Sequence, residues 1–497
     1  MNVDRRACVR LSQYIGKLAA GGPSPAKRQD RQLRGKEEEM RLSGKWKITG
    51  LLLSIAILLN GCMAGKPVQD DLGEDAPGSL KIWYPDVEPF HIKYGQMFAA
   101  KFPGIQVDEL QAREWIEEAR QGDYEEELKR LIELHKPDVL LLNQDEYEAL
   151  ARAGKLYNLD PAIMQDQFDL NGYMPGVIDM LREKGDGSLY GLAPFIRPRV
   201  MYYNADLFKE NSIDPPSNKM QWPDIFALAA RFANTGTKDA PVYGLIGNEA
   251  HDVLSQVALT LELQLFDAKG ENVVLQSEGW KQAFQIAADA LRSKAISVRS
   301  PKEAGDGMEG SRYFLAINKF LNGEAAMLIS DHYFASQLRS KAKTFDWGMV
   351  TVPINPARPD ESTSVYVPQI LAIAADSPRK QAAWNLIRFI NGPEVAKARS
   401  RTAGSDLPAI IDYVSGGDRA DTEVFYMLKP APQHNERVMK RIPDSFYEAY
   451  SSLVNEALQS VIDNEKPVDE ALAELEQKAQ AVLESARSKA QEAHQVR

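Results

Sequence analysis

The spacing of apolar positions changes in a regular order along the chain and predicts alternating strands and helices. Residues 80–84 form a short apolar strand that Pro85 ends. Apolar residues then recur at helical spacing over residues 90–102, and Pro103-Gly104 separates them from a second apolar segment at 105–107. A strand, a helix and a strand in this order predict a parallel βαβ unit.

The same alternation continues through the rest of the chain. Further strands are expected at 138–142, 200–203, 243–246, 325–329 and 370–374, and further helices at 146–153, 205–209 and 222–232. The last third is mainly helical, with one apolar stripe formed by Val468, Leu472, Leu475, Ala479, Val482 and Ala486. The pattern therefore predicts an α/β protein, and its length suggests more than one lobe.

One apolar run near the amino end does not fit this alternation. Residues 48–59 are almost entirely apolar and follow Arg41, Lys45 and Lys47. Twelve residues are too few to cross about 30 Å of hydrocarbon, so a basic flank with a short apolar core predicts a signal peptide at 40–61. The run ends in Gly61-Cys62, which resembles the bacterial lipobox. The alternative interpretation is a buried core helix with a cysteine there by chance.

The lipobox resemblance implies that Cys62 is lipidated and becomes the mature amino terminus. Residues 62–78 are polar and rich in glycine, proline and acidic side chains, which predicts a flexible tether. Residues 1–39 are a doubtful upstream extension, because an ordinary signal peptide would start at Met40. We therefore expect the folded part to begin near residue 79 and the protein to be anchored on the extracellular face of the cell membrane.

Charge and motif content exclude several classes of function. Residues 1–61 hold 12 basic and 5 acidic side chains, so the remainder holds 47 basic and 65 acidic ones, a net charge of −18. An acidic body argues against nucleic-acid binding. The only cysteines are Cys8 and Cys62, the six histidines are scattered, and glycine-rich phosphate loops and nucleophile elbows are absent. We therefore expect no metal site and no cofactor.

Several strings, taken in order, resemble the extracellular solute-binding proteins of ABC importers, in the sugar-binding group that includes maltose-binding protein. These strings are 136–143 with 150–156, 190–195 with 202–208, 323–329, 345–353, and 372–377 with 382–390. Each string alone is weak evidence, but their order over residues 80–480 behind a lipobox is specific.

This resemblance implies a two-lobed, periplasmic-binding-protein-like α/β fold with a central cleft and hinge crossovers. Lobe one would comprise 79–197 plus 354–405, and lobe two 198–353 plus 406–497. A few residues at the crossovers would absorb the change in backbone angles when the lobes close. The resemblance also implies a monomer that captures a sugar or oligosaccharide without catalysis and delivers it to an ABC permease.

A sugar site needs aromatic faces and planar polar side chains, and sites in open α/β sheets lie at the carboxyl ends of strands. We therefore select the polar and aromatic residues that follow the expected strands and lie at the crossovers. They are Tyr84, Asp86, Glu88, Asn143, Asp145, Phe195, Arg197, Glu249, Asp331, His332, Tyr333 and Tyr366. By the resemblance, Tyr333 takes the place of a stacking tryptophan, and Asp331 replaces a glycine.

Structural roles compete with these assignments. Asp145 suits the N-cap of the next helix, Arg197 a salt bridge at the hinge, and Trp83 and Tyr366 the core. Two other functions also stay open at this point. A lipid-anchored enzyme acting on polysaccharide would need two opposed carboxylates, and a sensor subunit would differ only in its membrane partner.

Overall fold

The computed structural model describes residues 78–110, 112–119, 124–233, 235–237, 241–247, 249–298, 309–340, 345–400, 406–413, 422–431, 438–439 and 442–495. The upstream extension, the signal peptide, Cys62 and the tether up to residue 77 lie outside the described residues. Within the described ranges, none of the helices is long and apolar enough to cross a membrane.

The first sheet has five strands in the order β2-β1-β3-β12-β4. Strand β1 (Leu80–Trp83) pairs in parallel with β2 (Val107–Leu110) and β3 (Val139–Leu142), which confirms the predicted βαβ start. Strand β12 (Ile370–Ile373) runs antiparallel between β3 and β4 (Gly191–Leu192).

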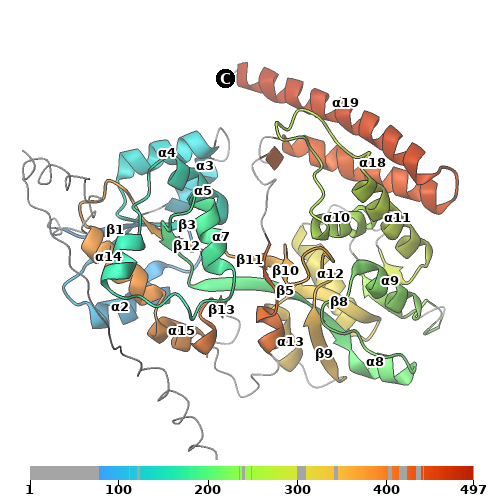
Figure 1. Ribbon diagram of the computed structural model, residues 1–497, viewed down its shortest axis with the longest axis horizontal. Helices are drawn as coiled ribbons and strands as arrows, with labels where there is room; N and C mark the ends of the chain where they lie inside the picture. Colours follow the sequence, from blue (N-terminus) through green and yellow to red (C-terminus); the bar gives the residue numbers. More distant parts are fainter. Residues whose placement is uncertain are drawn as a thin grey trace, which may run out of the picture. The chain divides into compact units, whose positions relative to one another are not determined.

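Helices precede and follow these strands along the chain (Figure 1). They are η1 (His91–Gly95), α2 (Gln96–Lys101), α3 (Ala112–Ala119), α4 (Tyr124–His135), α5 (Gln144–Arg152), α6 (Asp160–Gln165), α7 (Val177–Lys184), α14 (Lys380–Ile390) and α15 (Pro393–Ser400). The helix expected over 90–102 is therefore present, but its first part, η1, is a π-helical turn.

The second sheet follows the order β11-β5-β8-β6-β7, with β9 and β13 also paired to β5. Its strands are β5 (Phe195–Asn204), β6 (Tyr243–Ile246), β7 (Ile296–Ser297), β8 (Ala325–Asp331), β9 (Trp347–Thr351), β11 (Val365–Tyr366) and β13 (Leu407–Pro408). A separate short parallel pair joins β10 (Glu361–Ser362) to β14 (Lys429–Pro430).

The helices of this part include the long carboxyl-terminal pair. They are α8 (Ala205–Glu210), α9 (Trp222–Ala230), α10 (Ala250–Thr260), α11 (Glu278–Arg292), α12 (Glu309–Leu321), α13 (Tyr333–Ser340), α18 (Asp444–Ile462) and α19 (Val468–Gln495), with short 3-10 turns η2 (Ile411–Tyr413) and η3 (Val424–Tyr426). The apolar stripe predicted over residues 468–486 lies on α19, which packs against α18 and α11. Its residues Leu472, Leu475 and Ala479 are buried in that contact.

Strand β5 belongs to both parts of the fold. Its residues Phe195 and Ile196 pair with β13 and lie in the core of the first sheet. From position 199 onwards it pairs with β8, and Met201 lies in the core of the second sheet. Figure 1 shows β5 as the long strand that leaves the elements of the first sheet and enters those of the second. Between these two stretches, Arg197 and Pro198 pair with β11.

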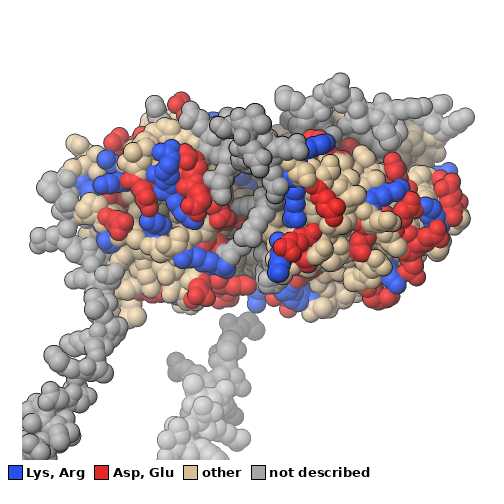
Figure 2. All heavy atoms as spheres, turned by 90° about the horizontal axis from the view of Figure 1, so that it is seen from above, with Lys and Arg blue, Asp and Glu red and all other residues tan. Residues whose placement is uncertain are grey.

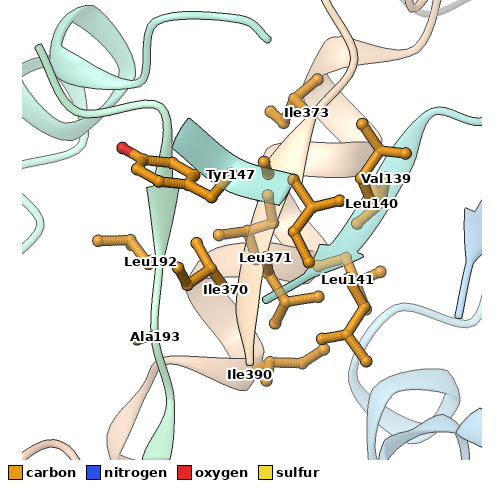
Figure 3. Packing of buried hydrophobic residues seen from close by; sticks show 14 of the residues in the cluster. Val139, Leu140, Leu141, Tyr147, Leu192, Ala193, Ile370, Leu371, Ile373 and Ile390 are labelled. Carbon is orange, nitrogen blue, oxygen red and sulfur yellow. The ribbon is translucent and has the colours of Figure 1, made fainter. Parts of the chain in front are cut away.

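The core of the first sheet forms where β3, β12 and β4 meet. All four residues of β3 and all four of β12 are buried, as expected for strands covered on both faces. Figure 3 shows Leu140 and Leu141 of β3, Ile370 and Leu371 of β12, and Leu192 of β4 packed against one another. Trp83 is fully buried in this core, so the structural interpretation of that residue is confirmed.

Acidic and basic side chains are interspersed over the described part of the surface. Figure 2 shows red and blue groups side by side on the face it presents. The many ion pairs agree with this mixing, for example Lys129 with Glu126 and Arg152 with Glu148, each at helical spacing. The excess of acidic residues is therefore not gathered into one acidic area on that face.

Candidate functional site

A charged group lies at the point where β5 passes between the two sheets. The guanidinium of Arg197 donates to both oxygens of Asp406, with Nε 2.5 Å from Oδ1 and Nη2 3.1 Å from Oδ2. The hydroxyl of Tyr333 donates to the same Oδ1 at 2.5 Å. The guanidinium carbon of Arg197 also lies 6.0 Å from the centre of the Tyr333 ring. We call Arg197, Asp406 and Tyr333 the Arg197 cluster.

Burial and hydrogen bonding act in opposite directions on the carboxylate of this cluster. Burial alone would raise the pKa of Asp406, but hydrogen bonds from Arg197 and Tyr333 outweigh it and leave that pKa below its ordinary value. The pKa of the Tyr333 hydroxyl is raised, first by burial and then by its bond to Asp406. Asp406 is therefore ionised and Tyr333 is a neutral donor at neutral pH.

The backbone places Tyr333 at the first position of a helix. Strand β8 runs two residues further than expected, to Asp331, and α13 begins at Tyr333. Oδ1 of Asp331 accepts the backbone N–H of Tyr333 at 3.0 Å, and the carbonyl of Asp331 accepts the Tyr202 hydroxyl at 2.8 Å. His332 is buried, and its ring centre lies 4.0 Å from that of Tyr333. Asp331 and His332 thus fix the place of the Tyr333 ring.

Tyr366 stands beside Arg197 on the neighbouring strand. The two residues are direct partners in the antiparallel pairing of β11 with β5, so their side chains point to the same face. Tyr366 is 41% exposed, which excludes the core role considered from the sequence. An accessible aromatic ring therefore accompanies the Arg197 cluster.

A second polar group surrounds Asp86. Nζ of Lys93 lies 2.7 Å from Oδ2 of Asp86 and 3.4 Å from the amide oxygen of Gln369, whose amide nitrogen donates to the same Oδ2 at 2.5 Å. Burial would raise the pKa of Asp86, but the bonds from Lys93 and Gln369 outweigh it and lower that pKa. We call Asp86, Lys93 and Gln369 the Asp86 cluster. Lys93 lies on the π-helical turn η1, a feature often found at functional sites.

Phe195 lies next to two cationic side chains. Nζ of Lys93 is 5.8 Å from the centre of its ring, and the guanidinium carbon of Arg399 is 5.9 Å from it. Lys93 also contributes to the lowering of the pKa of Asp406, so the two clusters share one electrostatic environment. Phe195 itself is fully buried, and so is nearly all of Tyr84, whose ring packs between Phe90 and Tyr94.

The other sequence-selected residues occupy helix starts or the rim of this region. Glu88 lies 3.7 Å from Arg399. Asn143 is the N-cap of α5, since its side chain accepts the backbone N–H groups of Asp145 and Glu146 at 3.0 Å each. The proposed N-cap role of Asp145 is therefore wrong, and that residue lies half-buried in the first turn. Glu249 precedes α10, with its carboxylate 3.5 Å from His251.

Four participants escaped the sequence analysis: Lys93, Gln369, Arg399 and Asp406. Of these four, only Lys93 could have been recognised from the sequence, because it is a lysine within the apolar helical stripe formed by Phe90, Tyr94 and Met97. Within the described residues, groups of three or more histidine, cysteine or acidic side chains suited to a metal ion do not occur. The site is thus an arrangement of paired charges, hydroxyls and aromatic rings.

Comparison with known proteins gives several similar sequences of bacterial origin, including the following three. A protein of Brucella abortus (strain 2308), named as a binding protein, is 24% identical over 73% of this chain and 91% of its own length. A protein of Streptomyces antibioticus named as a lipoprotein is 23% identical over 70% of this chain and 73% of its own length. The sn-glycerol-3-phosphate-binding periplasmic protein UgpB of Escherichia coli (strain K12) is 23% identical over 62% and 70%.

A solved structure and a family model agree with these similarities. The sugar-binding protein MalE of Xanthomonas citri superimposes with a TM-score of 0.59 at 20% identity, covering 83% of this chain and 99% of its own. Residues 95–421 match the family model described as bacterial extracellular solute-binding protein. The match contains Arg197, Tyr333 and Asp406, so the Arg197 cluster lies wholly within the matched region.

Proposed function

The chain belongs to the family of bacterial extracellular solute-binding proteins, and on that premise we propose that it captures a sugar or oligosaccharide and delivers it to the permease of an ABC importer. Its fold is the two-lobed α/β fold of MalE-like binding proteins, as the sequence predicted. The Arg197 cluster is the observation that carries the proposal, because it gathers side chains suited to hydroxyl groups at the strand that joins the two sheets.

The balance of charge favours a neutral solute. Arg197 faces Asp406, Lys93 faces Asp86, and Arg399 faces Glu88, so each of these cations lies against a carboxylate. A phosphate group would compete with those carboxylates for its positive partners. A sugar hydroxyl instead donates to a carboxylate and accepts from a guanidinium at the same time. The paired charges therefore support a polyhydroxylated ligand over the glycerol phosphate named for the Escherichia coli relative.

Aromatic rings supply the second requirement of a sugar site. Tyr333 is half-buried beside the ion pair, and Tyr366 exposes part of its ring on the face that Arg197 shares. A sugar ring presents an apolar face that packs on such rings while its hydroxyl groups meet the paired charges. We infer direct contacts from Arg197, Tyr333 and Tyr366, with the buried Asp406 and with Asp331, His332 and the Asp86 cluster holding them in place.

The anchored location and the lobe boundaries are also proposals. The run ending in Gly61-Cys62 supports a lipid anchor, and the name of the Streptomyces antibioticus relative is consistent with one. The proposed lobes are 79–197 with 354–405, and 198–353 with 406–497. Ala409 and Ile410 are buried in the core of the first sheet, which favours placing the boundary now proposed between residues 405 and 406 a few residues later.

A ligand screen tests the solute class. Thermal unfolding would be followed with neutral mono- and oligosaccharides and with sn-glycerol 3-phosphate, each in large excess. A true ligand at 100 times its Kd adds about 2.7 kcal/mol to the free energy of unfolding. We expect a rise with a neutral sugar and none with the phosphate, and Arg197→Gln should abolish the rise. Stabilisation by the phosphate alone would contradict the proposed solute class.

A turnover assay separates capture from catalysis. The protein would be incubated with the stabilising oligosaccharide, and the solution would be analysed for shorter products. We expect the ligand to be recovered intact. Shortened products that disappear with a site variant such as Asp406→Asn would favour the enzyme alternative.

A further inference from the structure

Gly176 brings the start of α7 against the short strand β14. It is the N-cap of α7 and has a left-handed backbone conformation, with φ +86° and ψ −15°. A Cβ atom at this position would lie 3.0 Å from Cβ of Lys429 and 3.2 Å from Cδ of Pro430, the two residues of β14. Such distances are shorter than those that Cβ atoms normally make, so any other residue here would press α7 and β14 apart.

The two elements in contact belong to different parts of the fold. Val177, directly after Gly176, is fully buried in the core of the first sheet. Leu428, directly before β14, is instead buried in a small core with Val352, against which Ile329 of β8 packs. The first sheet therefore carries α7, and the second sheet carries β14.

Ion pairs and backbone bonds attach the partner strand β10 to the helices of the second sheet. The backbone N–H of Lys429 donates to the carbonyl of Asp360, just before β10, at 2.8 Å. The carboxylate of Asp360 lies 2.6 Å from Nζ of Lys219, which precedes α9. Arg358 pairs with Glu262, which follows α10. Strand β14 is thus held from two sides, by its own small core and by β10, and offers α7 a fixed surface.

We propose that the contact between Gly176 and β14 sets the resting angle between the two lobes and, through that angle, the affinity for the solute. Two-lobed binding proteins close around their ligand by hinge motion, and a contact made at one hinge angle favours that angle. The apparent affinity then varies with the fraction of molecules in the arrangement that binds. Gly176 is therefore a positioning residue. Its effect on affinity rests on the proposed capture of a solute, whereas its effect on the lobe angle does not.

Gly176→Ala tests this contact, and Gly187→Ala is its matched control. Gly187 follows the other end of α7 and also has a positive φ, +92°, but a Cβ atom there would meet no atom of the described chain within 4 Å. Both substitutions strain the backbone, and only the first presses on β14. Spin labels at the exposed positions Leu134 of α4 and Leu259 of α10 would report the distance between the lobes, in a full chain whose two native cysteines are changed to serine.

We expect Gly176→Ala to shift the inter-label distance and to change the Kd for the stabilising sugar at least about fivefold, with Gly187→Ala leaving both unchanged. Lys429→Gly removes the side-chain atoms that the added methyl group would meet, and it keeps the N–H that bonds to Asp360. Adding it to Gly176→Ala should therefore return both values toward those of Lys429→Gly alone.

Three results would overturn the proposal: equal effects of Gly176→Ala and Gly187→Ala, an unchanged inter-label distance, or a shift that Lys429→Gly leaves in place. A shifted and rescued distance without binding of any sugar would uphold the contact and contradict the proposed solute. If Gly176→Ala fails to fold, recovery of folding with Lys429→Gly supports the contact, and failure of the double variant overturns it.

Discussion

The hydroxyl of Tyr333 lies 2.5 Å from Oδ1 of Asp406, although 73 positions separate the two residues in the sequence. Tyr333 begins a helix that follows a strand of the second sheet, whereas Asp406 precedes β13, which pairs with the start of β5, where Phe195 and Ile196 lie in the core of the first sheet. The bond therefore joins a helix that follows the second sheet to a segment that leads into the core of the first sheet. Because the hydroxyl is engaged with Asp406, the ring is the part of Tyr333 that remains to contact a solute.

Two substitutions at Tyr333 should distinguish the contribution of its ring to solute binding from that of its hydroxyl. Loss of a buried aromatic anchor commonly costs at least about 2 kcal/mol, so Tyr333→Ala should weaken solute binding roughly thirtyfold. Tyr333→Phe keeps the ring and should weaken binding much less. Calorimetric titration with the stabilising sugar measures both. Equal losses in the two variants would assign the effect to the hydroxyl, and unchanged affinity with a destabilised empty protein would make Tyr333 a core residue.

Asp406 should make stability depend on pH in the acidic range. Its pKa is lower in the folded protein than the value of about 3.9 in an unfolded chain, so its charged form favours folding above that pH. This contribution is lost as the pH falls through about 3.9 and then through the folded pKa. Between pH 5 and pH 3 the thermal midpoint of Asp406→Asn should therefore fall less than that of the wild type.

The matched control for this titration is Asp360→Asn. Asp360 pairs with Lys219 on the surface, where an ion pair contributes little, so its removal should leave the pH profile nearly unchanged. If Asp360→Asn and Asp406→Asn change the profile equally, the acid sensitivity does not arise from the Arg197 cluster.

Asp86 should be needed to keep Lys93 buried. The side chain of Lys93 is 4% exposed, and removing one partner of a buried ion pair leaves an uncompensated charge. Asp86→Asn should lower the free energy of unfolding by about 3–5 kcal/mol, and adding Lys93→Met should restore much of that loss. Urea unfolding measures both. The exposed pair of Lys101 and Glu394 is the control, and Glu394→Gln should have a small effect.

Cys62→Ser should release the protein from membranes. The expectation rests on the apolar run that ends in Gly61-Cys62. Cell fractionation followed by immunoblotting measures the distribution, with Cys8→Ser as the control that should stay membrane-bound. A Cys62→Ser protein that remains in the membrane fraction would refute the anchor.

The sheets were predictable because their central strands are continuous apolar runs. The four residues of β3 and the four of β12 are all buried, so period and composition alone identified them. The parallel start of the first sheet followed from the same reasoning. Helix starts were less predictable, because Asn143 caps α5 two residues before the position chosen from the pattern.

Only the site residues that lie next to an expected strand or crossover could be predicted from the local sequence. Tyr333 follows a strand closely and was found by the search at strand ends, and Arg197 was found at the expected crossover. Asp406 and Gln369 reach the site by long-range pairing, with Asp406 just before β13 and Gln369 just before β12. No local spacing marks such residues. Tyr84 was selected at a strand end and Phe195 at the expected crossover, but both rings are buried.

The central position of β12 also constrains when the first sheet is completed. β12 lies between β3 and β4, yet it is made more than two hundred residues after β3. Until residue 373 has left the ribosome, β3 and β4 both keep an unpaired hydrogen-bonding edge, and the two halves of that sheet stay apart. The amino-terminal part therefore cannot finish folding early in synthesis. Such a delay suits a chain that crosses a membrane through a narrow channel, because a chain with an incomplete sheet has not yet folded stably and can still pass through in an extended form.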